Sequence, residues 1–208
     1  MKKIVTLSFM LLFSGFLFAQ LPFNFGIKAG VTTSKLTTDI GETQSAILNF
    51  QGGAFARINI KKFYIQPEIY FTKKGGEIKD SMEYNNGQIL AVKKVKLNTV
   101  DIPLLIGYKL FDAKLVNLRV MAGPVMSFVI KKDPKITYNG QDVGLGKDFT
   151  KKDNFENQTW AIQAGAGMDV LMFSLDIRYE WGLNDIYKPS QADFKNNIFL
   201  VSLGWKIF

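Results

Sequence analysis

The chain has 208 residues and contains neither cysteine nor histidine. The lack of cysteine excludes disulfides, thiolate nucleophiles and cysteine-based metal sites, and the lack of histidine removes the commonest general base and metal ligand. Lysine and arginine number 26, against 18 aspartates and glutamates. The lysines are scattered in pairs among acids rather than forming a stripe with stacking aromatic residues, so we expect no nucleic-acid binding.

The first twenty residues, MKKIVTLSFMLLFSGFLFAQ, have the three parts of a secretory signal peptide. Two lysines precede an apolar run from Ile4 to Phe18, and the small residue Ala19 follows it. The run is too short to cross a membrane comfortably as a helix. We therefore expect residues 1–19 to be a signal peptide cleaved between Ala19 and Gln20 or close by, and residues 20–208 to form one domain outside the cytoplasm.

Beyond the signal peptide, the main pattern is an alternation of apolar and polar residues, which is typical of β-strands with two different faces. The segments that show it are 23–32, 50–60, 63–73, 99–110, 115–130, 160–170, 173–183 and 197–207. The phase of the fourth segment shifts near Asn98, which indicates a bulge or a strand that starts after Lys96. The pattern predicts eight strands.

Short and long connections alternate between these segments. Three connections are the size of hairpin turns, at 61–62, 111–114 and 171–172. The others are long, polar and rich in Gly, Asn, Asp and Lys, and we interpret them as loops or strand extensions. They are 33–49, 74–94, 131–156 and 184–194. Short turns at one end and long loops at the other are typical of an outer-membrane barrel.

Alternation does not say which face is inside, because a soluble barrel buries its apolar face whereas an outer-membrane barrel turns it to lipid. The apolar face carries aromatic residues near the strand ends, as interfacial girdles require. They are Phe23, Phe63, Phe71, Tyr108, Phe128, Trp160, Phe173, Trp181 and Trp205. The polar face is rich in glycine, which suits a narrow lumen. Its glycines are Gly26, Gly30, Gly53, Gly107, Gly123, Gly165, Gly167 and Gly182.

The polar face also carries both signs of charge in comparable numbers, with Lys109 among its cations. Buried charge is costly unless it is paired and hydrogen-bonded, so a balanced set suits a lumen. The predicted structural lumen charge network is Lys28, Arg57, Glu68, Asp101, Arg119, Asp169, Asp176, Arg178 and Glu180. The predicted fold class is all-β, an eight-stranded antiparallel up-and-down transmembrane β-barrel with short periplasmic turns and long extracellular loops.

Several motifs run along the whole mature chain: GIKAG (26–30), QPEIY (66–70), DIPLLIGY (101–108), AGP (122–124), AGAG (164–167) and LDIRYEWGLNDI (175–186). In these motifs and their order the chain resembles the PorT-type outer-membrane β-barrel family of Bacteroidetes-like bacteria. Barrels of this kind usually end on an aromatic residue in phase with the lipid-facing side chains, but Phe208 is one position out of step with Trp205 and Ile207. The resemblance implies a Gram-negative outer-membrane location and a link to type IX protein secretion.

Some eight-stranded barrels are lipid A-modifying enzymes, and here only carboxylate, Lys, Ser, Thr and Tyr chemistry would remain. The candidates Asp101, Asp176 and Glu180 share the polar face with arginines and lysines, and ion pairing explains them. We therefore expect no catalytic residue and no cofactor. The acids of the long loops lack the spacing of a calcium loop, so we expect no metal site. They are Asp133, Asp142, Asp148, Asp153 and Glu156.

The leading hypothesis is a non-enzymatic barrel that contacts outer-membrane lipid and lipopolysaccharide. Its lumen is a structural plug, and its long loops or periplasmic turns contact a protein partner. A narrow channel and a soluble ligand-binding β-barrel with inverted faces are the alternatives. Paired lysines at the loop bases are interpreted as ordinary membrane-rim charge, the alternative being contact with lipid A phosphates. They are Lys73, Lys74, Lys93, Lys94, Lys131, Lys132, Lys151 and Lys152.

Overall fold

The computed structural model describes residues 23–37, 44–45, 47–84, 87–113, 115–138, 141–142, 156–184 and 195–207. The strands are β1 (Phe23–Thr37), β2 (Gln44–Ser45), β3 (Ile47–Ile60), β4 (Phe63–Tyr84), β5 (Gly87–Asp112), β6 (Val116–Tyr138), β7 (Gln141–Asp142), β8 (Gln158–Val170), β9 (Phe173–Gly182) and β10 (Lys195–Lys206). In the part of the chain so described, no helix is long and apolar enough to cross a membrane. The expected signal peptide and Phe208 lie outside the described residues.

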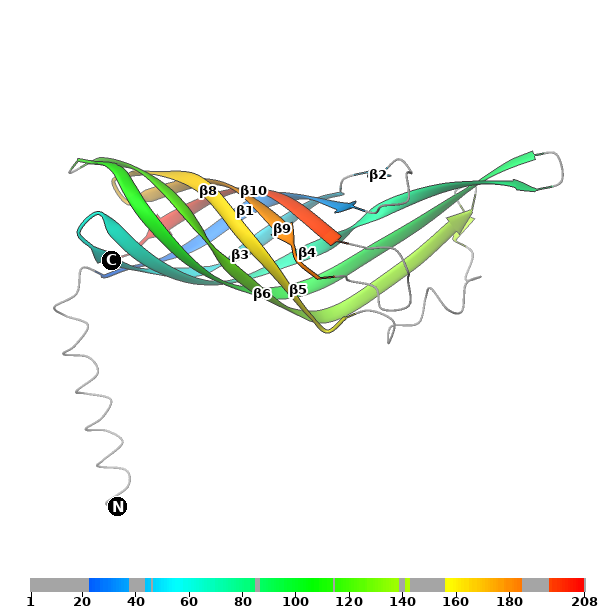
Figure 1. The fold of residues 1–208 in the computed structure, drawn as a ribbon, viewed down its shortest axis with the longest axis horizontal. Helices are drawn as coiled ribbons and strands as arrows, with labels where there is room; N and C mark the ends of the chain where they lie inside the picture. The colour runs from blue at the N-terminus through cyan, green and yellow to red at the C-terminus, as the bar shows by residue number, and fades with distance from the viewer. Residues whose placement is uncertain are drawn as a thin grey trace, which may run out of the picture.

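Eight of the strands form the wall of one closed barrel, while the two-residue strands β2 and β7 pair with β4 and β6 (Figure 1). The order around the wall is β1–β3–β4–β5–β6–β8–β9–β10, and every pairing is antiparallel. The ring closes because β10 pairs with β1, from Gly26 opposite Lys206 to Thr37 opposite Lys195. The predicted eight-stranded antiparallel barrel is confirmed, and closure leaves no strand edge inside the membrane.

The short turns lie together at one end of the barrel, as predicted. Two-residue turns at 61–62 and 171–172 join β3 to β4 and β8 to β9. Their first residues, Lys61 and Leu171, have positive φ values of 56° and 53°, a conformation that tight hairpin turns require and that most side chains disfavour. Between β5 and β6, the amide of Ala113 donates a hydrogen bond to the carbonyl of Val116 at 3.0 Å.

At the opposite end, three strands run beyond the segments that alternate in sequence. The hairpin of β4 and β5 stays paired until Tyr84 lies opposite Gly87, and β6 follows β5 as far as Tyr138, opposite Ala91. Figure 1 shows this part projecting past the barrel wall on the right. Range 74–94 is therefore mostly strand extension, because backbone hydrogen bonds prolong a hairpin without any apolar pattern in its side chains.

The phase irregularity near Asn98 corresponds to a bulge in the ladder between β5 and β6. Asn98 lies opposite Lys131 while the next residue, Thr99, lies opposite Val129. The extra residue is thus Ile130 of β6, so the predicted bulge is confirmed in place but belongs to the neighbouring strand. A strand start after Lys96 is wrong, since β5 begins at Gly87.

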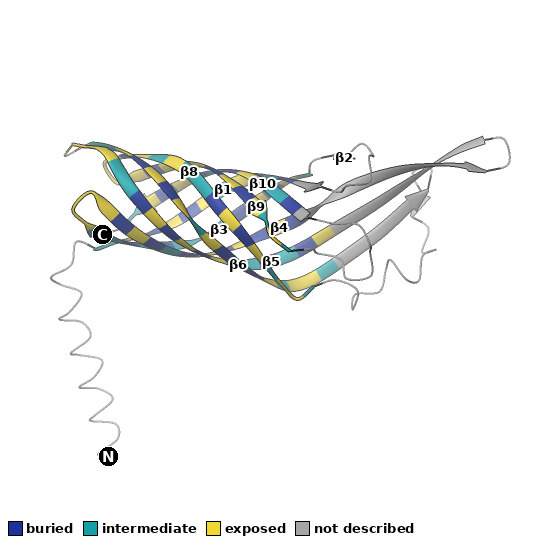
Figure 2. Ribbon diagram, in the orientation of Figure 1, coloured by how far each residue is buried: buried dark blue, intermediate teal, exposed yellow. Residues whose placement is uncertain are grey.

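The apolar face of the wall points outward along every barrel strand, as the alternating colours in Figure 2 show. In β9, Ile177 and Trp181 are 48% and 46% exposed, whereas Asp176 and Arg178, on either side of Ile177, are buried. Exposed apolar side chains on a complete outer surface need a lipid environment. The alternative of a soluble barrel with inverted faces is therefore wrong.

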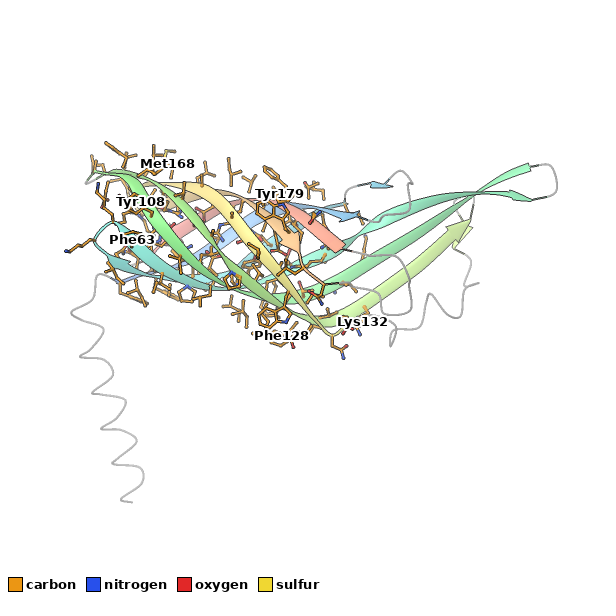
Figure 3. The ribbon with its side chains drawn as sticks, in the orientation of Figure 1. Phe63, Tyr108, Phe128, Lys132, Met168 and Tyr179 are labelled. Atoms are coloured by element: carbon orange, nitrogen blue, oxygen red, sulfur yellow. The ribbon has the colours of Figure 1, made fainter. Side chains whose placement is uncertain are left out.

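Aromatic side chains mark both ends of this outer apolar band. Phe63 and Tyr108 contact each other edge to face near the turns, with ring centroids 5.0 Å apart. Phe128 lies toward the other end, close to the projecting strands (Figure 3). In β9, Tyr179 and Trp181 form a second aromatic pair, with ring centroids 4.8 Å apart. The outer surface thus has the aromatic belts of a membrane-spanning barrel.

Candidate functional site

The inward side chains of the eight wall strands form the candidate site. Every member of the predicted lumen charge network is buried. These residues come from β1, β3, β4, β5, β6, β8 and β9, and strict alternation points each of them to the barrel axis. Lys109 is different, because its ammonium lies at the turn end, 3.3 Å from the half-exposed Asp112 of the same strand.

Near the turns, two arginines meet one aspartate. Arg57 Nη1 lies 2.5 Å from Asp169 Oδ2, and Arg119 Nη2 lies 3.1 Å from Asp169 Oδ1. The ring of Tyr64 faces both guanidinium groups, with its centroid 5.0 Å from the Cζ of Arg57 and 5.9 Å from that of Arg119. The carboxylate and the π-face together stabilise two like charges that would otherwise repel in a dry interior.

In the middle of the lumen, two cations and two carboxylates form a four-sided cluster. Lys28 Nζ lies 2.6 Å from Glu68 Oε1 and 2.8 Å from Asp176 Oδ2. Arg178 Nη2 contacts the same two oxygens, each at 2.7 Å. Arg119 reaches the other oxygen of Asp176, at 2.5 Å, and so connects the middle cluster to the one near the turns.

Near the loop end, a lysine that was assigned to the membrane rim occupies the lumen. The ammonium of Lys74 is buried and lies 3.0 Å from Asp101 Oδ2 and 2.9 Å from Ser127 Oγ. It also forms an ion pair and hydrogen bond with Glu180. The assignment of Lys74 to the rim is wrong, because β4 continues without a break and position 74 keeps the inward phase of Tyr70.

Two buried glutamines link the charge clusters. Gln66 accepts a hydrogen bond from Arg57 Nε at 2.6 Å and donates one to Glu68 Oε1 at 2.5 Å. Gln163 accepts from Arg178 Nη1 and donates to Glu180 Oε2, both at 3.1 Å. Each amide offers a donor to one side and an acceptor to the other, so a chain of polar contacts runs from the turn end to the loop end.

The charges of this lumen network balance once Lys74 is included. Five buried cations, Lys28, Arg57, Lys74, Arg119 and Arg178, face five buried carboxylates, Glu68, Asp101, Asp169, Asp176 and Glu180. Each carboxylate lies within ion-pair distance of at least one cation. Pairing of this kind is what a low-dielectric interior requires, because one unmatched ion there is strongly destabilising.

A small cavity borders the lumen network. At the loop end, Lys74, Thr99, Glu180 and Asn196 are among the residues around a cavity of about 10 Å³, roughly the space that one water molecule needs. In the described ranges, no group of three or more His, Cys, Asp or Glu side chains is placed to hold a metal ion. Of the loop acids, Asp148 and Asp153 lie outside the described residues.

The residues considered for catalysis are held in ion pairs. Asp101 and Glu180 share Lys74, and Asp176 contacts Lys28, Arg119 and Arg178. Both oxygens of Asp176 contact cations, whereas Lys74 contacts only one oxygen of Asp101. These contacts account for the three carboxylates as partners of buried cations.

Sequence reasoning missed three members of the lumen network: Gln66, Lys74 and Gln163. The neutral residues carried a readable signal, because they share the polar phase, but no charge drew attention to them. For Lys74 the signal was its phase, because strict alternation from Tyr70 onward points position 74 into the lumen.

Comparisons with known proteins agree with this architecture. The family model described as an outer membrane protein beta-barrel domain matches residues 18–188. Among solved structures, Ail of Yersinia pestis is 15% identical, covers 89% of this chain and 99% of its own, and has a TM-score of 0.45. Neisserial surface protein A is 13% identical, with 88% and 97% covered and a TM-score of 0.47. The outer membrane enzyme PagL is 11% identical, with 86% and 99% covered and a TM-score of 0.43.

With TM-scores below 0.5, these solved structures carry no conclusion about the fold or the activity of this chain. No curated protein matched the sequence. The family model is different, because it covers most of the chain, including most of the barrel strands and the residues of the lumen network. The chain therefore belongs to the outer membrane protein beta-barrel domain family and resides in the outer membrane.

Proposed function

We propose that this chain is a structural, non-enzymatic barrel whose lumen is plugged by its own charge network and whose loops or turns bind a protein partner. The observation that carries the plug is the unbroken set of buried contacts from Arg57 to Lys74. A pore needs mobile water along its axis, whereas here arginine, lysine and tyrosine side chains occupy it. An eight-stranded barrel is about as wide as its side chains can fill.

Planar-bilayer recordings test the plug. The refolded barrel should produce no stepwise conductance, while a known porin reconstituted in parallel should. Replacing Arg57 and Arg119 by Ala removes two of the largest fully buried side chains and provides a second measurement, because an emptied axis should begin to conduct ions. Regular conductance steps from the unaltered protein would instead establish the alternative, a narrow channel.

The site of partner binding has two candidates, the long loops and the periplasmic turns. Deleting residues 133–154 removes most of the longest predicted loop together with the projecting end of β6, and replacing Lys61 and Lys62 by Asn-Gly changes an exposed turn while keeping its length. Both variants should fold, as judged by heat-modifiable migration in detergent gels. Cross-linking in cells, followed by affinity purification, should lose the partner in one variant and keep it in the other. Retention of every partner by both variants would refute binding through these segments.

We also propose that the chain is a PorT-type barrel with a role in type IX protein secretion. The QPEIY motif at 66–70 and the WGLNDI motif at 181–186 support this assignment. A component of the type IX secretion machinery should copurify with the barrel. Deletion of the barrel protein should reduce export of type IX substrates. Normal export in the absence of the barrel would contradict a role in type IX secretion.

Residues 1–19 are proposed to be removed during export. Their charged start, apolar middle and small Ala19 support this. N-terminal sequencing of the protein from outer-membrane fractions should begin at Gln20, and an intact Met1 would contradict it.

A further inference from the structure

The lysines that follow the apolar band divide between the two sides of the wall. Lys73 is exposed on the outer face, while its neighbour Lys74 is buried in the lumen. This follows from strand geometry, in which successive side chains point to opposite faces. Lys96 of β5 and Lys131 of β6 are also exposed. Of the lysines at this level of the wall, which include Lys96 as well as some of the paired lysines, only the outward subset can therefore meet the membrane.

Strand register brings this outward subset together. Lys73 lies directly opposite Asn98, and Asn98 lies directly opposite Lys131 on the next strand. Lys96 precedes Asn98 by two residues and so shares its face. Neighbouring strands are roughly 4.8 Å apart, which places the backbones of Lys73 and Lys131 about 10 Å from each other. We call Lys73, Lys96 and Lys131 the outer lysine cluster.

The outer lysine cluster lies immediately beyond the lipid-facing apolar band. Phe71 precedes Lys73 by two residues on the same face and is 62% exposed, and Ile130 beside Lys131 is 63% exposed. Phe128 marks the same level of the wall, at the end nearer the projecting strands in Figure 3. In an outer-membrane barrel this level is the outer interface, where lysine side chains extend toward the headgroups.

The chemistry of the outer lysine cluster fits a multiply charged anion. Strand register places three lysines around Asn98, whose amide can donate further hydrogen bonds. The same register sets Asp133 opposite Lys96, so this part of the ladder keeps a surplus of two positive charges. A phosphate monoester carries between one and two negative charges at neutral pH and has several acceptor oxygens. Lysine binds phosphate as a compact point charge, so the cluster needs no single rigid geometry.

We propose that the outer lysine cluster binds the phosphate groups of an outer-leaflet glycolipid of the lipid A type. The lipid source is favoured over free phosphate because Phe71 and Ile130 lie directly below the lysines on the same face. They would contact the acyl chains of a lipid whose headgroup reaches the cluster. The site rests on the outer-membrane location and is independent of any partner-binding role.

Native mass spectrometry of the delipidated, refolded barrel in neutral detergent tests this site. Bisphosphorylated lipid A should bind, whereas the same lipid after phosphatase treatment should bind far more weakly. The K73Q/K96Q/K131Q variant should lose affinity for the intact lipid on the order of 100-fold, given roughly fivefold for each lysine near a charged membrane surface. Inorganic phosphate in excess should displace little lipid.

The matched control is K61Q/K62Q/K109Q, which removes the same charge at the turn end of the barrel. It should bind lipid A as the unaltered protein does. Equal losses in the control, full binding by the triple variant, or no preference for the phosphorylated lipid would each overturn the proposal. Ready displacement by inorganic phosphate would overturn the lipid source. If the triple variant fails to show heat-modifiable migration, the single variants K73Q and K131Q should each bind about fivefold more weakly.

Discussion

The ring of Tyr64 lies over Gly107, its direct partner across the ladder between β4 and β5. A Cβ atom at Gly107 would collide with the phenol, so no larger residue fits opposite this ring. The ring in turn faces the guanidinium groups of Arg57 and Arg119. Because Gly107 has no side chain, the ring of Tyr64 has the space to lie between the wall and two buried cations.

Replacing Gly107 by Ala should therefore destabilise the barrel by about 1–3 kcal/mol, the usual cost of overpacking. Urea unfolding in detergent, followed by heat-modifiable migration, measures the change in free energy of unfolding. Gly52→Ala is the matched control, because a Cβ there would meet only the carbonyl of Lys28, at 3.9 Å. Adding Tyr64→Leu to the Gly107 variant should recover part of the loss. Equal effects at both glycines would contradict the close approach.

Lys74 is expected to be the most sensitive lysine of the wall. Lys74→Met leaves Asp101 and Glu180 buried without their shared cation, and loss of one partner from a buried pair costs about 3–5 kcal/mol. Lys73→Met, one residue away on the exposed face, should change the free energy of unfolding in neutral detergent by less than ~0.5 kcal/mol. Neutralising both acids in the Lys74→Met background should restore stability. If the two lysine variants unfold alike, the ion-pair assignment of Lys74 fails.

The tryptophans report directly on the orientation of the wall. Trp160, Trp181 and Trp205 are 46%, 46% and 48% exposed on the outer face. In liposomes of brominated lipid, the fluorescence of each single-tryptophan variant should be strongly quenched, whereas aqueous acrylamide should quench little. Quenching should be strongest with bromine near the headgroup, because indole rings prefer the interface. Strong acrylamide quenching with no effect of bromine would place these rings away from lipid.

Closure of the barrel between β1 and β10 is open to a chemical test, since the chain has no native cysteine. Val31 and Val201 are direct partners in that ladder. A Val31→Cys, Val201→Cys pair should oxidise to a disulfide, because directly opposed Cα atoms lie within bonding range. The control pair Val31→Cys, Ile177→Cys spans one more strand and should stay reduced. Non-reducing gels of the unboiled protein distinguish the two, and cross-linking of both pairs would argue against this register.

Most of the wall could be predicted from the sequence, because side-chain alternation is a local property of extended backbone. In β9 the alternation of Ile177 and Trp181 with Asp176 and Arg178 established both a strand and two unlike faces. The aromatic residues at strand ends and the glycines on the polar face then indicated which side met lipid. The structure agrees with this predicted orientation, because only the outer surface of a closed barrel contacts the hydrocarbon of the membrane.

Contacts within the lumen were decided by tertiary structure alone. Lys28 and Asp176 are 148 positions apart in the chain, and only the order and register of the strands around the ring bring them within 2.8 Å. The same is true of Lys74, whose sequence neighbours resemble a loop although β4 carries it inward beside Glu180. Alternation determines the face on which a side chain lies, whereas ladder register and ring closure determine which charges meet there.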